Sequence, residues 1–168
     1  MLDRPGLEDE KIIACLRASY ALTVTKLEFR PLGHDSHAGV YRVGANGQAY
    51  FLKVKSDPLV EISVLLPRYL KEQGIEPIIA PLPTDTQDLW TKVGDFTLIL
   101  FPFIEARSGW EAGFSDSQWV EFGAVLKQLH ATRLPLELLN RMSKETFTPD
   151  PKWVAIVEQL HAAVRDRV

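Results

Sequence analysis

Apolar and polar positions follow two different periods along the chain. Between residues 7 and 20, apolar side chains recur every three or four positions, which predicts an amphipathic helix; they are Ile12, Ile13, Leu16 and Tyr20. Three strands are predicted next, at residues 27–32, 40–43 and 48–55. The last two flank Gly44-Ala45-Asn46-Gly47, and Asn-Gly between two apolar runs is typical of a tight hairpin turn.

The third strand has two different faces. Strict alternation places Tyr50, Leu52 and Val54 on one side and Phe51, Lys53 and Lys55 on the other. Ser56-Asp57-Pro58 then combines a capping oxygen with a proline suited to a first helical turn. We predict a helix over 59–73 that stops at Gly74, with Pro67 kinking it or dividing it in two.

A second hairpin is predicted at residues 89–93 and 96–102, across Gly94-Asp95. Between the helix and this hairpin, residues 77–83 carry three prolines and make a poor central strand. The pattern therefore indicates an α+β fold, in which five strands with mostly antiparallel neighbours enclose one inserted helix.

The pattern becomes helical after Phe103. Ser115 and Gln118 have the spacing of a capping box, and a helix ending near His130 should carry one apolar face, formed by Trp119, Phe122, Val125, Leu126 and Leu129. We interpret these aromatic residues as core. A short helix or turn is predicted at 134–142, and a last helix opens at Asp150-Pro151. Two units are expected, residues 1–104 and residues 105–168.

Composition narrows the function classes. The chain has 168 residues, of which 46% are hydrophobic and 24% charged, with a formal net charge of −3. Its lysines and arginines are scattered, which argues against a nucleic-acid partner. No apolar run is long enough for a membrane span, and the N-terminal residues lack the pattern of a secretory signal. The single cysteine, Cys15, fits a reducing compartment, so we expect a cytoplasmic protein.

Lys53 and Glu61 are the first candidates for chemistry. A lysine fixed on a strand can hold phosphate groups in line, and a carboxylate on the next element would keep it aimed. Glu61 follows Lys53 by eight residues, on the predicted helix. Strand parity alone leaves open that Lys53 is a solvated charge and that Glu61 is an exposed helix residue.

The loop from Gly33 to Gly39 is the second candidate. Its bracketing glycines would let backbone amides approach a phosphate, and Ser36 would add a hydroxyl donor. The loop lacks the full G-x-G-x-x-G pattern, so an ordinary hairpin loop remains an alternative. His34 and His37 flank Asp35 without a clear third ligand, and we predict no metal site there.

The third candidate is the junction at Phe101, Phe103 and Ile104. A strand that ends between two lobes offers backbone donors and acceptors to the edge of an adenine ring. The phenylalanine side chains themselves suit a core.

Taken together, these features resemble the aminoglycoside phosphotransferase family, whose fold is similar to that of eukaryotic protein kinases. The branch that phosphorylates spectinomycin is the most similar. The resemblance extends from about residue 27 to residue 164, and four segments carry it: A-Y-F-L-K-V-K, I-L-F-P-F-I-E-A, Q-W-V-E-F-G-A-V-L-K-Q-L-H and P-D-P-K-W-V-A-I-V.

The resemblance implies specific roles. Lys53 would hold the α- and β-phosphates of ATP, and Glu61 would orient Lys53. The loop with Gly33, Ser36 and Gly39 would cover the phosphates, and the backbone of Phe101–Ile104 would meet adenine. In the family, a segment H-x-D-x-x-x-x-N and a later Asp then supply the catalytic base and the Mg²⁺ ligands.

That catalytic segment is absent from the sequence: His130 is followed by Ala-Thr-Arg, and His161 by Ala-Ala-Val. No catalytic or metal-binding residue is therefore assigned, and Mg²⁺ is expected only in a full-length enzyme. The sequence predicts the N-terminal portion of an ATP-dependent small-molecule O-phosphotransferase, truncated before its catalytic loop and not catalytic alone. Its partners would be a nucleotide and, in a full-length form, a small hydroxyl acceptor such as an aminoglycoside.

Two alternatives stay open. One is a stand-alone, pseudokinase-like nucleotide-binding module completed by a partner chain, and the other is an unrelated α+β interaction domain. If the chain is truncated, its later helices should lack packing partners and expose an apolar surface, leading to self-association. The acceptor and the choice between ATP and GTP are left open.

Overall fold

The computed structural model describes residues 4–31, 35–106, 109–144, 152–153, 155–157 and 159. Among them, five strands form one antiparallel sheet with the order β1-β2-β3-β5-β4. The strands are β1 (Val24–Arg30), β2 (Ala38–Ala45), β3 (Gln48–Lys55), β4 (Thr91–Val93) and β5 (Phe96–Pro102). The predicted α+β fold, with a five-stranded sheet, is therefore confirmed.

Local turn chemistry explains the two hairpins. Asn46 and Gly47 both have positive φ, 50° and 75°, as a two-residue turn with the twist of its flanking strands requires. Gly94, with φ of 57°, closes the turn between β4 and β5. Each predicted hairpin is therefore present, although β1 and β2 begin earlier than the pattern indicated and β4 is shorter.

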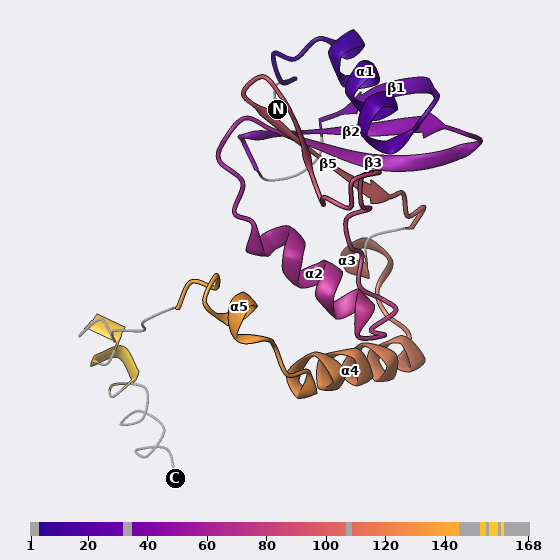
Figure 1. Ribbon diagram of the computed structural model, residues 1–168. Helices are drawn as coiled ribbons and strands as arrows, with labels where there is room; N and C mark the ends of the chain where they lie inside the picture. The colour runs from indigo at the N-terminus through magenta and orange to yellow at the C-terminus, as the bar shows by residue number, and fades with distance from the viewer. Residues whose placement is uncertain are drawn as a thin grey trace.

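Helix α1 (Asp9–Tyr20) covers one face of the sheet (Figure 1). Its predicted apolar stripe is buried there, and the core it forms with β2, β3 and β5 contains Ile12, Leu16, Tyr20, Tyr41, Val43, Leu52, Val54, Leu98 and Leu100. Burial of this face fixes the parity of β3: Leu52 and Val54 face α1, so Phe51, Lys53 and Lys55 face away from it.

Helix α2 (Ile62–Glu72) lies on the opposite side of the sheet, where Val64 packs against Ile99 of β5 (Figure 1). The helix starts three residues later than predicted, and Pro67 is accommodated within a single helix. Its end is as predicted: the N–H of Gly74 donates to Lys71 O and that of Ile75 to Leu70 O, and Gly74 has a φ of 85°. This is a Schellman cap, in which glycine adopts the left-handed conformation at low cost.

The chain continues with α3 (Gly109–Ala112), α4 (Asp116–Ala131) and α5 (Leu136–Leu139). The predicted capping box of α4 is formed by Ser115 and Gln118. Helix α4 lies farther from the sheet than α2 does, and α5 lies beside α2 (Figure 1). The predicted opening of the last helix at Asp150-Pro151 lies outside the described residues, while 152–153, 155–157 and 159 are helical.

The interpretation of the α4 aromatic residues as core is wrong for the described structure. Trp119 is 55% exposed, Phe122 46% and Leu126 38%, and no residue of α4 is buried. Trp119 and Phe122 pack instead against Phe114, with ring centroids 4.8 Å and 6.2 Å from that of Phe114. The helix has the predicted apolar face, and Phe114 packs against part of it while Trp119, Phe122 and Leu126 stay exposed.

Candidate functional site

Strand register brings the site together on the sheet face turned away from α1. Lys53 of β3 pairs with Val40 of β2 and with Ile99 of β5, and Phe51 pairs with Phe101. Partners that face each other across antiparallel strands project on the same side of the sheet. The alternation of β3 and its two neighbours therefore places a lysine among apolar side chains.

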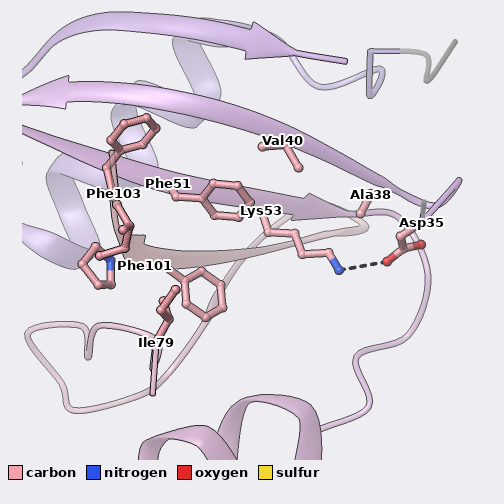
Figure 2. Close-up of a pocket in the computed structure, with 10 residues that line it drawn as sticks. Asp35, Ala38, Val40, Phe51, Lys53, Ile79, Phe101 and Phe103 are labelled. Carbon is pink, nitrogen blue, oxygen red and sulfur yellow. Dashed lines mark ion pairs between the residues drawn. The ribbon is translucent and has the colours of Figure 1, made fainter. Parts of the chain in front are cut away.

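A cavity of about 470 Å³ lies on this face. It is lined almost entirely by apolar side chains, with the charged pair Asp35 and Lys53 at one end and Phe103 at the other (Figure 2). Its remaining lining residues are Ala38, Val40, Phe51, Ile79, Phe101, Pro102 and Ile104. Such a cavity suits a ligand with a flat apolar part and an anionic end.

The apolar part of the cavity is ordered by ring contacts. Phe51 and Phe101 meet edge to face, with centroids 6.0 Å apart. The Arg42 guanidinium of β2 lies over the Phe103 ring, 4.9 Å from its centroid, within the range of a cation–π contact. Phe103 is thus held at the mouth of the cavity by a residue that the sequence analysis did not single out.

Lys53 is aimed by a carboxylate, but not by the predicted one. Its Nζ lies 3.0 Å from Oδ2 of Asp35, in the turn before β2 (Figure 2). Glu61 instead pairs with Arg141, from the segment after α5, and lines a separate cavity beside Trp90. The predicted Lys53–Glu61 ion pair is therefore wrong: Glu61 precedes the first residue of α2, and its carboxylate pairs with Arg141.

Asp35 is the site residue whose role the sequence did not reveal. Its Oδ1 accepts a hydrogen bond from the His37 backbone N–H at 3.1 Å, which fixes the carboxylate to its own turn. Hydrogen bonds from Lys55 and Lys53 hold the pKa of Asp35 well below its ordinary value. An aspartate three residues before β2, the strand that pairs with the lysine strand β3, was the available signal, but the direction of its side chain depends on the loop's conformation.

The glycine-bracketed loop contributes differently from the prediction. Gly33 and His34 lie outside the described residues, and Ser36 is exposed in the turn and does not line the cavity. Gly39 lies in β2, where an added Cβ would stand 2.2 Å from Cγ of Pro5. Gly39 is therefore needed for the close approach of the N-terminal segment, and contact of this loop with phosphate stays a prediction.

The junction after β5 has the predicted position. Phe101 and Phe103 line the cavity with Ile104, and the pairing of β5 with β3 ends at Pro102. The backbone of Phe103 and Ile104 is therefore outside the sheet ladder, at the edge of the cavity. Ile79, from the segment after α2, forms the wall of the cavity that lies opposite Val40 and Phe51 (Figure 2).

Among the described residues, no three His, Cys, Asp or Glu side chains are grouped closely enough to hold a metal ion. In the same part of the chain, no helix is both long and apolar enough to cross a membrane.

No family model matches the chain, and no curated protein matches it. Solved structures do match, among them two complexes of one enzyme. Spectinomycin phosphotransferase APH(9)-Ia in complex with ADP and spectinomycin shares 30% identity over 94% of this chain, with a TM-score of 0.79. The AMP-bound complex of APH(9)-Ia shares 27% identity over 94% of the chain, with a TM-score of 0.74.

The five-stranded sheet with its helices is a kinase-like fold, which this chain shares with these ADP- and AMP-bound phosphotransferase structures. The predicted resemblance to the aminoglycoside phosphotransferase family is therefore confirmed. The chain spans 47% of the length of each of these two solved chains.

Proposed function

We propose that this chain binds an adenine nucleotide in the cavity between β2, β3, β5 and Ile79. The adenine would lie between Val40 and Phe51 on one side and Ile79 on the other, with its edge toward the backbone of Phe103. Its phosphates would extend toward Lys53. The observation that carries the proposal is an apolar cavity ending in a fixed lysine, in a chain whose structural neighbours were crystallised with ADP and AMP.

In this proposal the chain is the nucleotide-binding portion of an ATP-dependent O-phosphotransferase for a small hydroxyl compound, of the aminoglycoside or spectinomycin kind. The residues present suit one part of phosphoryl transfer, which is to hold and orient the phosphates of the nucleotide. The sequence contains no H-x-D-x-x-x-x-N segment, so the base and the Mg²⁺ ligands are not supplied by these residues. We expect nucleotide binding without turnover from this chain alone. We also propose that the chain has two units, residues 1–104 and 105–168, and a cytoplasmic location.

Isothermal titration calorimetry with adenosine, AMP and ADP tests the binding proposal. Val40→Trp places an indole in the cavity and should weaken adenosine binding at least about tenfold, because the ring occupies the adenine position. Arg17→Trp, at an exposed position of α1 on the other face of the sheet, is the matched control and should bind as the parent does. The proposal fails if all three ligands leave both the calorimetric signal and the melting temperature of the parent unchanged.

We further propose that the purified chain self-associates through the exposed face of α4. The face presents Trp119, Phe122 and Leu126 to solvent, and a contiguous apolar surface of this kind favours association. In a solution of the purified chain, a second copy is the available partner. Sedimentation velocity should show concentration-dependent association that Trp119→Gln with Phe122→Gln reduces. A parent that stays monomeric up to millimolar concentration would contradict this.

A further inference from the structure

Two lysines of β3 converge on a single oxygen atom. Lys53 Nζ lies 3.0 Å and Lys55 Nζ 2.9 Å from Oδ2 of Asp35. The two side chains meet because residues two apart on a strand project on the same face. Lys55 is the more buried of the two, with 12% of its side chain exposed, against 31% for Lys53.

Lys55 is held in place independently of Asp35. Its Nζ also lies 2.9 Å from Oδ1 of Asp57, which follows β3. Burial lowers the pKa of Lys55, but hydrogen bonds to Asp57 and Asp35 outweigh that effect and raise it, so the ammonium group stays charged. If Asp35 moved away, Asp57 would keep Lys55 directed at the same point.

The position of Asp35 Oδ2 is therefore a ready-made anion site. A carboxylate oxygen and a phosphate oxygen accept the same charge-assisted hydrogen bonds from ammonium groups. A second cavity, of about 310 Å³, adjoins the nucleotide cavity here, and both are lined by Asp35, Lys53 and Phe101. Lys55 and Ser63 line the second cavity, so polar groups continue beyond Lys53.

We propose that phosphate oxygens of the bound ligand replace Asp35 Oδ2 between the two lysines. Lys55 is then a second phosphate-binding residue beside Lys53, and Asp35 is an internal anion that the phosphates displace. The inference rests on the proposed nucleotide function, and it adds the residue that binds with Lys53 and the carboxylate that competes. If this is so, the affinity for the phosphates of the ligand depends on Asp35 and Lys55, and the affinity for its nucleoside does not.

Two probes separate these parts: pyrophosphate without added metal, and adenosine, each measured by calorimetry on the whole chain. Lys55→Met should weaken pyrophosphate binding about tenfold and leave adenosine binding unchanged, because one charged hydrogen bond is lost. Lys55→Arg should retain most of the pyrophosphate affinity. Asp35→Asn should strengthen pyrophosphate binding about tenfold, because the competing charge is gone.

Matched controls come from ion pairs away from the cavity. Lys26→Met removes a lysine from an exposed pair with Glu28 on β1, and Glu72→Gln removes a carboxylate from a pair with Arg68 on α2. Neither control should change the affinity for pyrophosphate or adenosine. Far-UV circular dichroism of every variant verifies that each is folded.

The outcomes distinguish this inference from the nucleotide proposal. Pyrophosphate binding that depends on Lys55 and Asp35, in a chain that ignores adenosine, would support the anion site and refute the adenine cavity. Adenosine binding with pyrophosphate affinity insensitive to Lys55→Met would keep the nucleotide proposal and overturn the inference. A weaker pyrophosphate affinity in Asp35→Asn would also overturn it, since Asp35 would then position the lysines instead of competing with the ligand.

Discussion

Leu52 and Lys53 are adjacent on β3 but project from opposite faces of the sheet. Replacing each in turn should distinguish the role of the core face from that of the site face. Leu52 is fully buried against α1 and its neighbours, whereas Lys53 projects into the cavity and pairs with Asp35. We therefore expect Leu52→Ala to reduce the stability of the fold strongly, and Lys53→Met to affect it little.

The magnitudes follow from burial. Leu52→Ala removes roughly three buried carbons, worth about 0.8 kcal/mol each, and the cavity that remains raises the cost to about 3 kcal/mol. In Lys53→Met, the lost ion pair joins side chains that are 31% and 37% exposed. Solvent screening limits such a pair to about 0.2–1 kcal/mol.

Urea denaturation at neutral pH, followed by circular dichroism, gives the free energy of unfolding of both variants and the parent. Calorimetry with ADP on the same samples should show the opposite order, with weaker binding in Lys53→Met than in the folded fraction of Leu52→Ala. Equal losses of stability in the two variants would contradict these roles of Leu52 and Lys53. An ADP affinity that Lys53→Met leaves intact would contradict them as well.

Three further predictions concern the loop, the titration of the site and α4. Gly39→Ala should lower the free energy of unfolding by about 1–3 kcal/mol, because the new Cβ would collide with Pro5; deletion of residues 1–6 should relieve part of that loss. The lowered pKa of Asp35 stabilises the folded state above about pH 4, near the pKa of the unfolded carboxyl group, and this contribution is lost as the pH falls through the folded-state pKa. The difference in unfolding free energy between the parent and Asp35→Asn, about 1 kcal/mol or less, should therefore shrink below about pH 4. A difference that does not depend on pH would contradict the assignment. Ser115→Ala should destabilise α4 by about 1 kcal/mol, since the Gln118 N–H loses its acceptor, and hydrogen exchange should report the change in α4 but not in β3.

The parts of the fold that follow from short-range chemistry were predictable. The Asn46-Gly47 turn, the glycine end of α2 and the Ser115 capping box each depend on a few adjacent residues, and each is present. The bounds of β3 were predicted correctly because a hairpin turn fixes one end and Ser56-Asp57-Pro58 fixes the other. The start of α2 was predicted three residues too early, because Ser56-Asp57-Pro58 was interpreted as a helix start, whereas the helix begins at Ile62.

The site was predictable only where it depends on alternation. Parity along β3 placed Lys53 on the face opposite the core. The end of β5 was predicted to offer its backbone at the junction, whereas the side chains of Phe101 and Phe103, interpreted as core, line the cavity. The identity of the lysine's partner depends on how a turn and a helix start are oriented in space. Sequence distance favoured Glu61, whereas the fold brings Asp35 to Lys53 and gives Glu61 to Arg141.

Helix α4 illustrates the difference between an amphipathic pattern and burial. The spacing of its aromatic residues sets which face is apolar, while burial depends on what packs against that face. Since no residue of α4 is buried among the described residues, its stability comes from its cap and its local contacts with Phe114. Most helical stability in proteins comes from packing of the apolar face, so α4 should open at a lower free energy than β3, whose Leu52 and Val54 are fully buried. The proposed nucleotide cavity lies on the sheet, whose strands share the core that α1 closes.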